Sequence, residues 1–330
     1  MTSLVLLLLL LLPTTSLSSS SHSPSTSAAR RFSKIYAFGD SYTDTGNTHS
    51  ADGPYSFGYV SSLLRHHLLH RSTNRGRSTA IEHEFYVQNN ITIDVTPQSL
   101  MTQLGWFQKH VEAAGRAAGM DEALFWVGEI GATTTPTALF PPYRRALSGS
   151  CRQNVFSFLE ALLNKGAKHI VVQGLPLTGC LPLSMTVAPQ DDRDDIGCVA
   201  SVNKQSSTHN TLLLNKLNEL RRRYPKAVIS YADYHGAHHA IMKNPAAHGF
   251  TETFKTCCGS GGGAYNFDLF ATCGSPGVNK ACSDPAKFVN WDGVHLTEAM
   301  YKAVANMFFN RGYCRPGFDV LLSSKGDAAK

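Results

Sequence analysis

Short apolar stretches alternate with amphipathic helical stretches along most of this chain, and this alternation constrains the fold more than any other feature. The predicted strands are 35–38, 123–130, 169–173 and 228–233. The predicted helices, each with apolar side chains at helical spacing, are 99–118, 155–165, 201–224 and 297–309. Strands that alternate with helices form a parallel sheet covered by helices on both faces. The sequence therefore predicts an α/β fold.

A tight turn that carries a serine follows the first predicted strand. Ile35–Phe38 leads directly into Gly39-Asp40-Ser41. Active sites of parallel α/β sheets lie at the carboxyl ends of strands, which is where this turn falls. A serine there exposes its hydroxyl, and its own backbone N–H can point at an oxyanion. Taken alone, these residues are equally typical of an ordinary turn before a helix.

A second polar motif lies near the other end of the chain. Asp292 and His295 are three residues apart in Trp291-Asp292-Gly293-Val294-His295, so one loop can hold both and the carboxylate can orient the imidazole. Alone, this motif is more typical of a helix N-cap aspartate followed by a surface histidine. Together with Ser41 it supplies a nucleophile, an orienting acid and a base, in the order Ser, Asp, His.

With these two motifs the chain resembles the plant-type GDSL esterase/lipases of the SGNH hydrolase superfamily. The resemblance also rests on residues 124–131, 174–180 and 257–259, and it runs from about Phe32 to Phe318. It implies a three-layer α/β/α sandwich with a mostly parallel, flavodoxin-like sheet. It further implies a carboxylic ester hydrolase that uses Ser41 as nucleophile, His295 as base and Asp292 as orienter, without a cofactor or a metal.

The resemblance implies small-molecule or cell-wall esters as substrates, among them acylated sugars, phenolic esters and short-chain lipids. The same three residues would also serve transfer of the acyl group to an alcohol. The sequence holds no nucleotide-binding glycine fingerprint.

Two family blocks that supply oxyanion donors are altered in this chain. Beside the Ser41 N–H, the family uses a glycine and an asparagine. The nearest glycine here is Gly76, and Arg77 stands at the family's glycine position, while Thr133 stands where the asparagine belongs. A threonine hydroxyl is shorter than an amide and points differently. The alternative function is therefore a catalytically impaired homologue that binds esters without turning them over.

Both departures fall in segments of unusual composition, 61–78 and 132–152. These segments hold seven arginines and no acidic residue, so the net charge of +6 becomes −1 once they are set aside. The basic balance is local, and it does not indicate a nucleic-acid partner.

We hypothesise that both segments are translated out of frame, as in a frameshifted gene model. With assumed codons, deletion of one base from an Ala-Asn-Asp-Tyr-Ala-Tyr block yields Ala-Thr-Thr-Thr-Pro-Thr, the sequence of residues 132–137. Resequencing the transcript tests this hypothesis.

The N-terminus carries an unbroken apolar run, Leu4–Leu12, followed by a Ser/Thr/Pro-rich stretch. The run is too short to span a bilayer and is typical of a signal peptide, with a retained anchor as the alternative. We expect residues 1–29 to form the signal peptide and leader, and residues 30–330 to form one domain. This predicts a secreted, extracellular (apoplastic) protein with no stable membrane insertion, and glycosylation at Asn90 in Asn90-Ile91-Thr92.

The chain has eight cysteines, which is typical of an oxidising compartment. Cys257, Cys258, Cys273 and Cys282 lie close together in the sequence. A zinc site would need a matched second Cys-x-x-Cys pair, which is missing, so we expect disulfides among the 105 pairings that eight cysteines allow.

Three histidines, His235, His238 and His239, follow the 228–233 strand. A metal site would need a further ligand and a closed geometry. We therefore expect them on a loop or on a helix surface.

Overall fold

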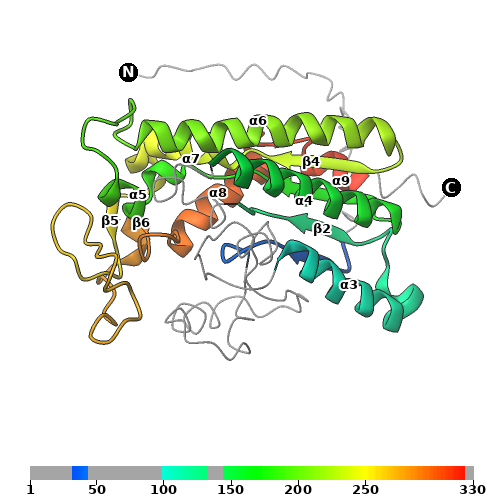
Figure 1. Cartoon of the computed structure of the whole chain (residues 1–330), viewed down its shortest axis with the longest axis horizontal. Coiled ribbons are helices and arrows are strands. Elements are labelled where there is room, and N and C mark those ends of the chain that lie inside the picture. Colours follow the sequence, from blue (N-terminus) through cyan, green and yellow to red (C-terminus); the bar gives the residue numbers. More distant parts are fainter. Residues whose placement is uncertain (1–31, 44–98, 132–143, 324–330) are drawn as a thin grey trace, which may run out of the picture. The chain divides into compact units, whose positions relative to one another are not determined.

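The computed structural model describes residues 32–43, 99–131 and 144–323 (Figure 1). In these ranges a five-stranded sheet has the order β1-β2-β3-β4-β7. Its strands are β1 Ile35–Phe38, β2 Leu124–Val127, β3 His169–Gln173, β4 Val228–Ala232 and β7 Cys314–Arg315. β1 to β4 pair in parallel, and β7 pairs with β4 antiparallel. The predicted parallel α/β sheet is confirmed, with one antiparallel strand added at its edge.

Alternate residues of each strand point to opposite faces of the sheet, as the strand period of two requires. Tyr36, Phe125, Ile170 and Ile229 enter one hydrophobic core. Leu124, Val171 and Ala232 enter a second core on the other face. Both faces of the sheet are therefore buried, which explains why these strands are nearly continuous apolar runs.

Helices supply the other half of each core. The first core is covered by α3 Leu100–Ala114, α4 Arg144–Asn164 and α6 Ala200–Arg223. The second is covered by α7 Tyr234–Lys243, α8 Glu298–Asn310 and α9 Phe318–Ser323. Figure 1 shows α4 and α6 side by side, and the two helices are in contact. The result is a three-layer α/β/α arrangement.

Capping side chains set the starts of three helices. Ser99 accepts from the Thr102 N–H before α3, Asp233 from the Gly236 N–H before α7, and Thr297 from the Met300 N–H before α8. Each bond satisfies a backbone donor that has no partner within its own helix.

The structure corrects two predicted boundaries. The helix expected from Val155 begins at Arg144, so the last part of the 132–152 segment is helical. The strand expected over 123–130 ends at Val127, because Gly128 turns the chain with a φ of 109°. A short 3₁₀ helix, Gly115–Ala118, completes the end of the predicted 99–118 helix.

A second, two-stranded sheet lies outside the main one and was not predicted. It pairs β5 Glu252–Thr256 with β6 Phe288–Asn290 in parallel. Two short 3₁₀ helices, Pro245–His248 and Pro285–Lys287, precede these strands, and another, Thr178–Cys180, leads into α5 Pro182–Val187. β6 matters most for function, because it delivers the chain to Asp292.

Within the described ranges, every helix is too short or too polar to cross a membrane. The apolar run Leu4–Leu12 and the leader 1–29 lie outside those ranges.

Phe158 of α4 packs against Phe38 of β1 in the first core, and its loss is expected to destabilise the protein. Its side chain is fully buried, and its ring meets the Phe38 ring edge-on with centroids 5.0 Å apart. We expect Phe158→Ala to lower the free energy of unfolding by about 3–5 kcal/mol in urea titrations, since it leaves a cavity. The control Phe270→Ala, at a side chain 94% exposed, should change it by less than about 0.5 kcal/mol. Equal effects of the two changes would contradict this account of the core.

Candidate active site

The Ser41 turn follows β1 and is held against the end of β2. The Asp40 N–H donates to the Glu129 carbonyl at 3.3 Å, and the Thr43 hydroxyl donates to the Gly128 carbonyl at 2.7 Å. A Cβ on Gly39 would lie 2.5 Å from Thr43 Oγ1 and 3.0 Å from the Glu129 carbonyl oxygen. Only glycine allows the turn to approach β2 this closely.

The Asp292–His295 loop follows β6 and is folded around the Asp292 carboxylate. Asp292 Oδ1 accepts from the backbone N–H of His295 at 2.6 Å and of Val294 at 3.0 Å. The loop closes where the Trp291 N–H donates to the His295 carbonyl at 2.8 Å. One carboxylate oxygen thus shapes the loop, and the other remains for the imidazole.

The structure brings Ser41, His295 and Asp292 into one chain of hydrogen bonds. His295 Nδ1 lies 2.7 Å from Asp292 Oδ2, and His295 Nε2 lies 2.7 Å from Ser41 Oγ. An ionised carboxylate can only accept, so the Nδ1 proton faces Asp292 and Nε2 accepts from the serine hydroxyl. Asp292 and His295 are buried, and Ser41 is half-buried.

The surroundings keep Asp292 ionised. Burial alone would raise the pKa of its carboxyl, but the charge and side-chain hydrogen bond of His295 oppose this. Together with the N–H groups of His295 and Val294, they hold the pKa below its usual range. The acceptor that orients the imidazole is therefore charged near neutral pH.

Tyr42 packs beside the imidazole and ties the two motifs together. Its ring centroid lies 5.4 Å from that of His295, and its hydroxyl donates to the Val294 carbonyl. Burial raises the pKa of the Tyr42 phenol well above its ordinary value, with smaller contributions from Tyr301, Tyr234 and nearby carboxylates. The phenol therefore remains a hydrogen-bond donor. This role of Tyr42 was not predicted from the sequence, although Tyr42 directly follows Ser41.

Two adjacent cysteines fix the backbone that precedes Asp292. The Cys257 N–H donates to the Asn290 carbonyl at 3.0 Å, and the Cys258 N–H donates to the Trp291 carbonyl at 2.7 Å. Cys257 is bonded to Cys282, and Cys258 to Cys273. The predicted disulfides are confirmed, and they anchor the end of β6 and the residue that precedes Asp292.

A third disulfide and one thiol complete the cysteines whose side chains the structure describes. Cys180 is bonded to Cys198, and Cys314 is a buried free thiol whose pKa burial raises to about 11. That pKa keeps the thiol protonated and unreactive.

Phe267 covers Gly293 at the bend of the Asp292–His295 loop. Gly293 has a φ of 93°, and a Cβ there would lie 2.2 Å from the ring of Phe267. The Gly293 carbonyl accepts from the Leu183 N–H at 3.1 Å. The bend is therefore held by the Phe267 ring, from the segment closed by the Cys258–Cys273 disulfide, and by the start of α5.

A polar stripe on α6 supports the segment that leads to α5. Asn210 exchanges two hydrogen bonds with the Leu175 backbone, at 2.7 and 2.9 Å. Asn203 accepts from the Gly179 N–H at 2.9 Å. The Gly-Leu-Pro-Leu-Thr-Gly motif, residues 174–179, is thus fixed against α6.

The remaining predicted site residues, Gly76, Thr133 and Asn90, lie outside the described residues. Segment 61–78 and residues 132–143 lie outside them as well.

The expectation of surface histidines after β4 was wrong for one of three. All lie on α7, but His238 is fully buried, with Nδ1 3.4 Å from the Leu177 nitrogen. Burial lowers the pKa of His238 to about 3, so it is neutral. The ring packs into the second core because its helical position faces the sheet. No group of three or more His, Cys, Asp or Glu in the described part of the chain could hold a metal ion.

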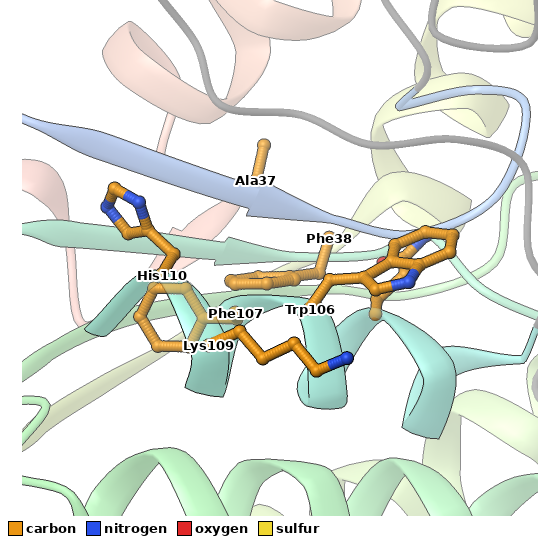
Figure 2. A pocket seen from close by; sticks show the side chains of 7 residues that line it. Ala37, Phe38, Trp106, Phe107, Lys109 and His110 are labelled. Carbon is orange, nitrogen blue, oxygen red and sulfur yellow. The ribbon is translucent and has the colours of Figure 1, made fainter. Parts of the chain in front are cut away.

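A cavity of about 280 Å³ lies beside the start of the Ser41 turn, between β1 and α3. Figure 2 shows Phe38 and Phe107 between the strand and the helix, with Trp106 at one end and His110 at the other. Among the described residues, Ala37, Phe38, Gln103, Trp106, Phe107, Lys109 and His110 line this cavity.

Comparison with known proteins places the chain in a family. Residues 35–308 match the model of the GDSL-like lipase/acylhydrolase family. A GDSL esterase/lipase of Arabidopsis thaliana is 43% identical over 90% of this chain and 90% of its own length. Acetylajmalan esterase 2 of Rauvolfia serpentina is 32% identical over 83% of this chain and 88% of its own length.

The chain belongs to the GDSL lipase/acylhydrolase family, and its fold is the three-layer SGNH hydrolase fold. It is a carboxylic ester hydrolase. The resemblance deduced from the sequence motifs is confirmed.

Gly293→Ala is expected to lower ester hydrolysis by about 100-fold, because the methyl group displaces Phe267 and the Asp292–His295 loop with it. The measurement is kcat on a short-chain nitrophenyl ester. Gly277→Ala is the matched control: its φ of 82° imposes similar strain, but no atom lies within 4 Å of its Cβ. Equal losses in both variants would show that strain, and not the contact with Phe267, carries the effect.

Removal of the Cys258–Cys273 disulfide is expected to lower both stability and kcat. The bond joins residues 15 apart, so the double change to serine should cost about 3 kcal/mol in thermal unfolding. The kcat should fall as well, because Cys258 holds Trp291. The Cys180–Cys198 pair, with a separation of 18, should lose similar stability and keep more of its kcat. An unchanged kcat without Cys258–Cys273 would contradict the anchoring role.

Proposed function

We propose that this protein is a secreted serine esterase that hydrolyses carboxylic esters through Ser41, His295 and Asp292. The observation that carries the proposal is the hydrogen-bond chain, with both links at 2.7 Å. It has the order and the spacing that nucleophilic acyl transfer requires.

The proposed reaction has two halves. His295 Nε2 takes the proton of the Ser41 hydroxyl as Oγ attacks the ester carbonyl. The imidazolium then donates that proton to the departing alcohol and leaves an acyl-enzyme on Ser41. His295 Nε2 then takes a proton from water as the water attacks the acyl-enzyme, and returns that proton to Ser41 Oγ as the bond to the acyl group breaks and the acid leaves. Asp292 stabilises the imidazolium in both halves, which its ionised state supports.

The oxyanion that forms in each half needs hydrogen-bond donors. The Ser41 backbone N–H is one proposed donor, and the proposed others are Gly76 and Thr133. Because Thr133 replaces an amide, we expect slower turnover than in relatives that keep the asparagine; loss of one such donor typically costs about 10²–10³ in rate.

The proposed substrates are small esters of acylated sugars, phenolic compounds or short-chain lipids. The name of acetylajmalan esterase 2 supports a small acyl group on a larger alcohol. The leader 1–29 and the disulfides support secretion to the apoplast, with residues 30–330 as one domain and Asn90 glycosylated.

A second candidate function is ester binding without turnover. The altered blocks around Gly76 and Thr133 favour it. The intact Ser41–His295–Asp292 chain weighs against it, because a binding protein has no chemical use for an oriented imidazole at hydrogen-bond distance from a serine.

Ser41→Ala is expected to abolish hydrolysis of a short-chain nitrophenyl ester, and Asp292→Asn to lower kcat by up to about 10⁴ through loss of the correct imidazole tautomer. The double variant Ser41→Ala, His295→Ala should lose no more than Ser41→Ala alone, because residues that act as one unit are not additive. Circular dichroism provides the control for folding.

Activity retained in folded Ser41→Ala would overturn the proposed mechanism. A folded wild-type protein without activity on any ester of the three classes would favour the binding function.

A further inference from the structure

The Ser41 turn has a second support that does not come from the strands. Gln103, a buried residue of α3, forms two hydrogen bonds with the backbone of Gly39. The Gly39 N–H donates to Gln103 Oε1 at 3.1 Å, and Gln103 Nε2 donates to the Gly39 carbonyl at 2.8 Å. Both ends of one amide therefore bind one residue, two positions before Ser41.

Gln103 occupies a core position of its helix. It lies among Leu100, Leu104 and Phe107, which all enter the first core, and its exposed fraction is 3%. A buried amide costs free energy unless it is hydrogen-bonded, and an apolar side chain would fill this position without that cost. A polar residue that departs from the local pattern in this way is typical of a functional site.

The Gln103 amide lies at a cavity between α3 and β1. The cavity of about 280 Å³ opens there, and Phe38, Gln103 and Trp106 line it (Figure 2). On the other side, the turn is held by the carbonyls of Gly128 and Glu129 at the end of β2. Gln103 thus fixes the turn from the helix side, and β2 fixes it from the sheet side.

We propose that Gln103 is a positioning residue of this esterase, which holds the Gly39 backbone so that Ser41 Oγ stays within reach of His295 Nε2. The proposal rests on the proposed function, in which Ser41 is the nucleophile. The hydrogen bonds of Gln103 to Gly39 reach Ser41 through the backbone of the turn, so we expect their loss to lower the rate of attack more than ester binding.

The first test compares Gln103→Met, which keeps the length of the side chain and removes its two hydrogen bonds to Gly39, with the control Gln108→Met on the same helix. The probes are a nitrophenyl acetate and a nitrophenyl phosphonate, which releases one nitrophenolate as Ser41 is phosphonylated. We expect Gln103→Met to lower kcat and the phosphonylation rate by about 10- to 100-fold, since a small displacement of a reacting group has effects of this size. KM should stay within about twofold, as for an interaction that acts on the chemical step.

The second test uses Gln103→Glu and a pH profile. The ionised carboxylate can accept from the Gly39 N–H but cannot donate to the Gly39 carbonyl, whereas the protonated acid can do both. The ratio of variant to wild-type kcat should therefore rise as pH falls, and the division removes the ionisation of His295, which both proteins share. The same ratio for Gln103→Met should be independent of pH.

Three results would overturn the proposal: an unchanged kcat in Gln103→Met, a raised KM at constant kcat, or variants unfolded at the assay temperature by circular dichroism. The last would show that the amide supports the domain and not the turn. Ser41→Ala, run in parallel, keeps the two hypotheses apart. If Ser41→Ala is active, the proposed function fails; if it is inactive while Gln103→Met matches wild type, only the role of Gln103 fails.

Discussion

The hydrogen bond between Ser41 and His295 joins positions 254 residues apart, and the rest of the structure depends on holding its two ends at 2.7 Å. The serine end is fixed by the parallel pairing of β1 with β2. The imidazole end is fixed by β6 and by the backbone bonds from Cys257 and Cys258. The β1 turn and the loop after β6 must therefore hold their side chains within fractions of an ångström of the required positions. This explains why these segments are fixed by disulfides, a buried amide and close glycine contacts.

Because Asp292 is buried, its hydrogen bonds both stabilise the loop after β6 and orient His295. A buried carboxylate is costly unless its oxygens are satisfied, and here three hydrogen bonds from Val294 and His295 satisfy them. The same three bonds shape the loop and aim the imidazole. Stability and orientation therefore come from one set of contacts, so a substitution at Asp292 disturbs the loop as well as the charge.

The sequence was sufficient for the elements whose burial leaves a strong apolar pattern. β1 and β3 have the predicted bounds, and the structure brings together Ser41, His295 and Asp292, the three residues that the two motifs singled out. The bounds of β2 and α4 were less accurate, because a glycine with positive φ ends one and a polar stretch begins the other.

What the sequence could not give depends on contacts between distant segments. β5 is mostly polar and only partly buried, and β6 and β7 have three and two residues, so no apolar pattern indicates a strand at any of the three. The pairing of Cys257 with Cys282 needs the fold, since sequence leaves every pairing open. Gln103 and His238 are polar but buried, so the apolar pattern of the sequence predicts both on the surface. The buried amide and the buried imidazole are visible only once α3 and α7 are packed on the sheet.

The altered oxyanion blocks change the expected rate more than the expected mechanism. Loss of one donor costs about 10²–10³, and losses of donors that act together do not multiply. The Ser41 N–H, the first proposed donor, belongs to the turn that contacts Gln103 and the residues after β2. In the proposed mechanism, weaker second and third donors would therefore lower kcat without changing the residues through which acyl transfer passes.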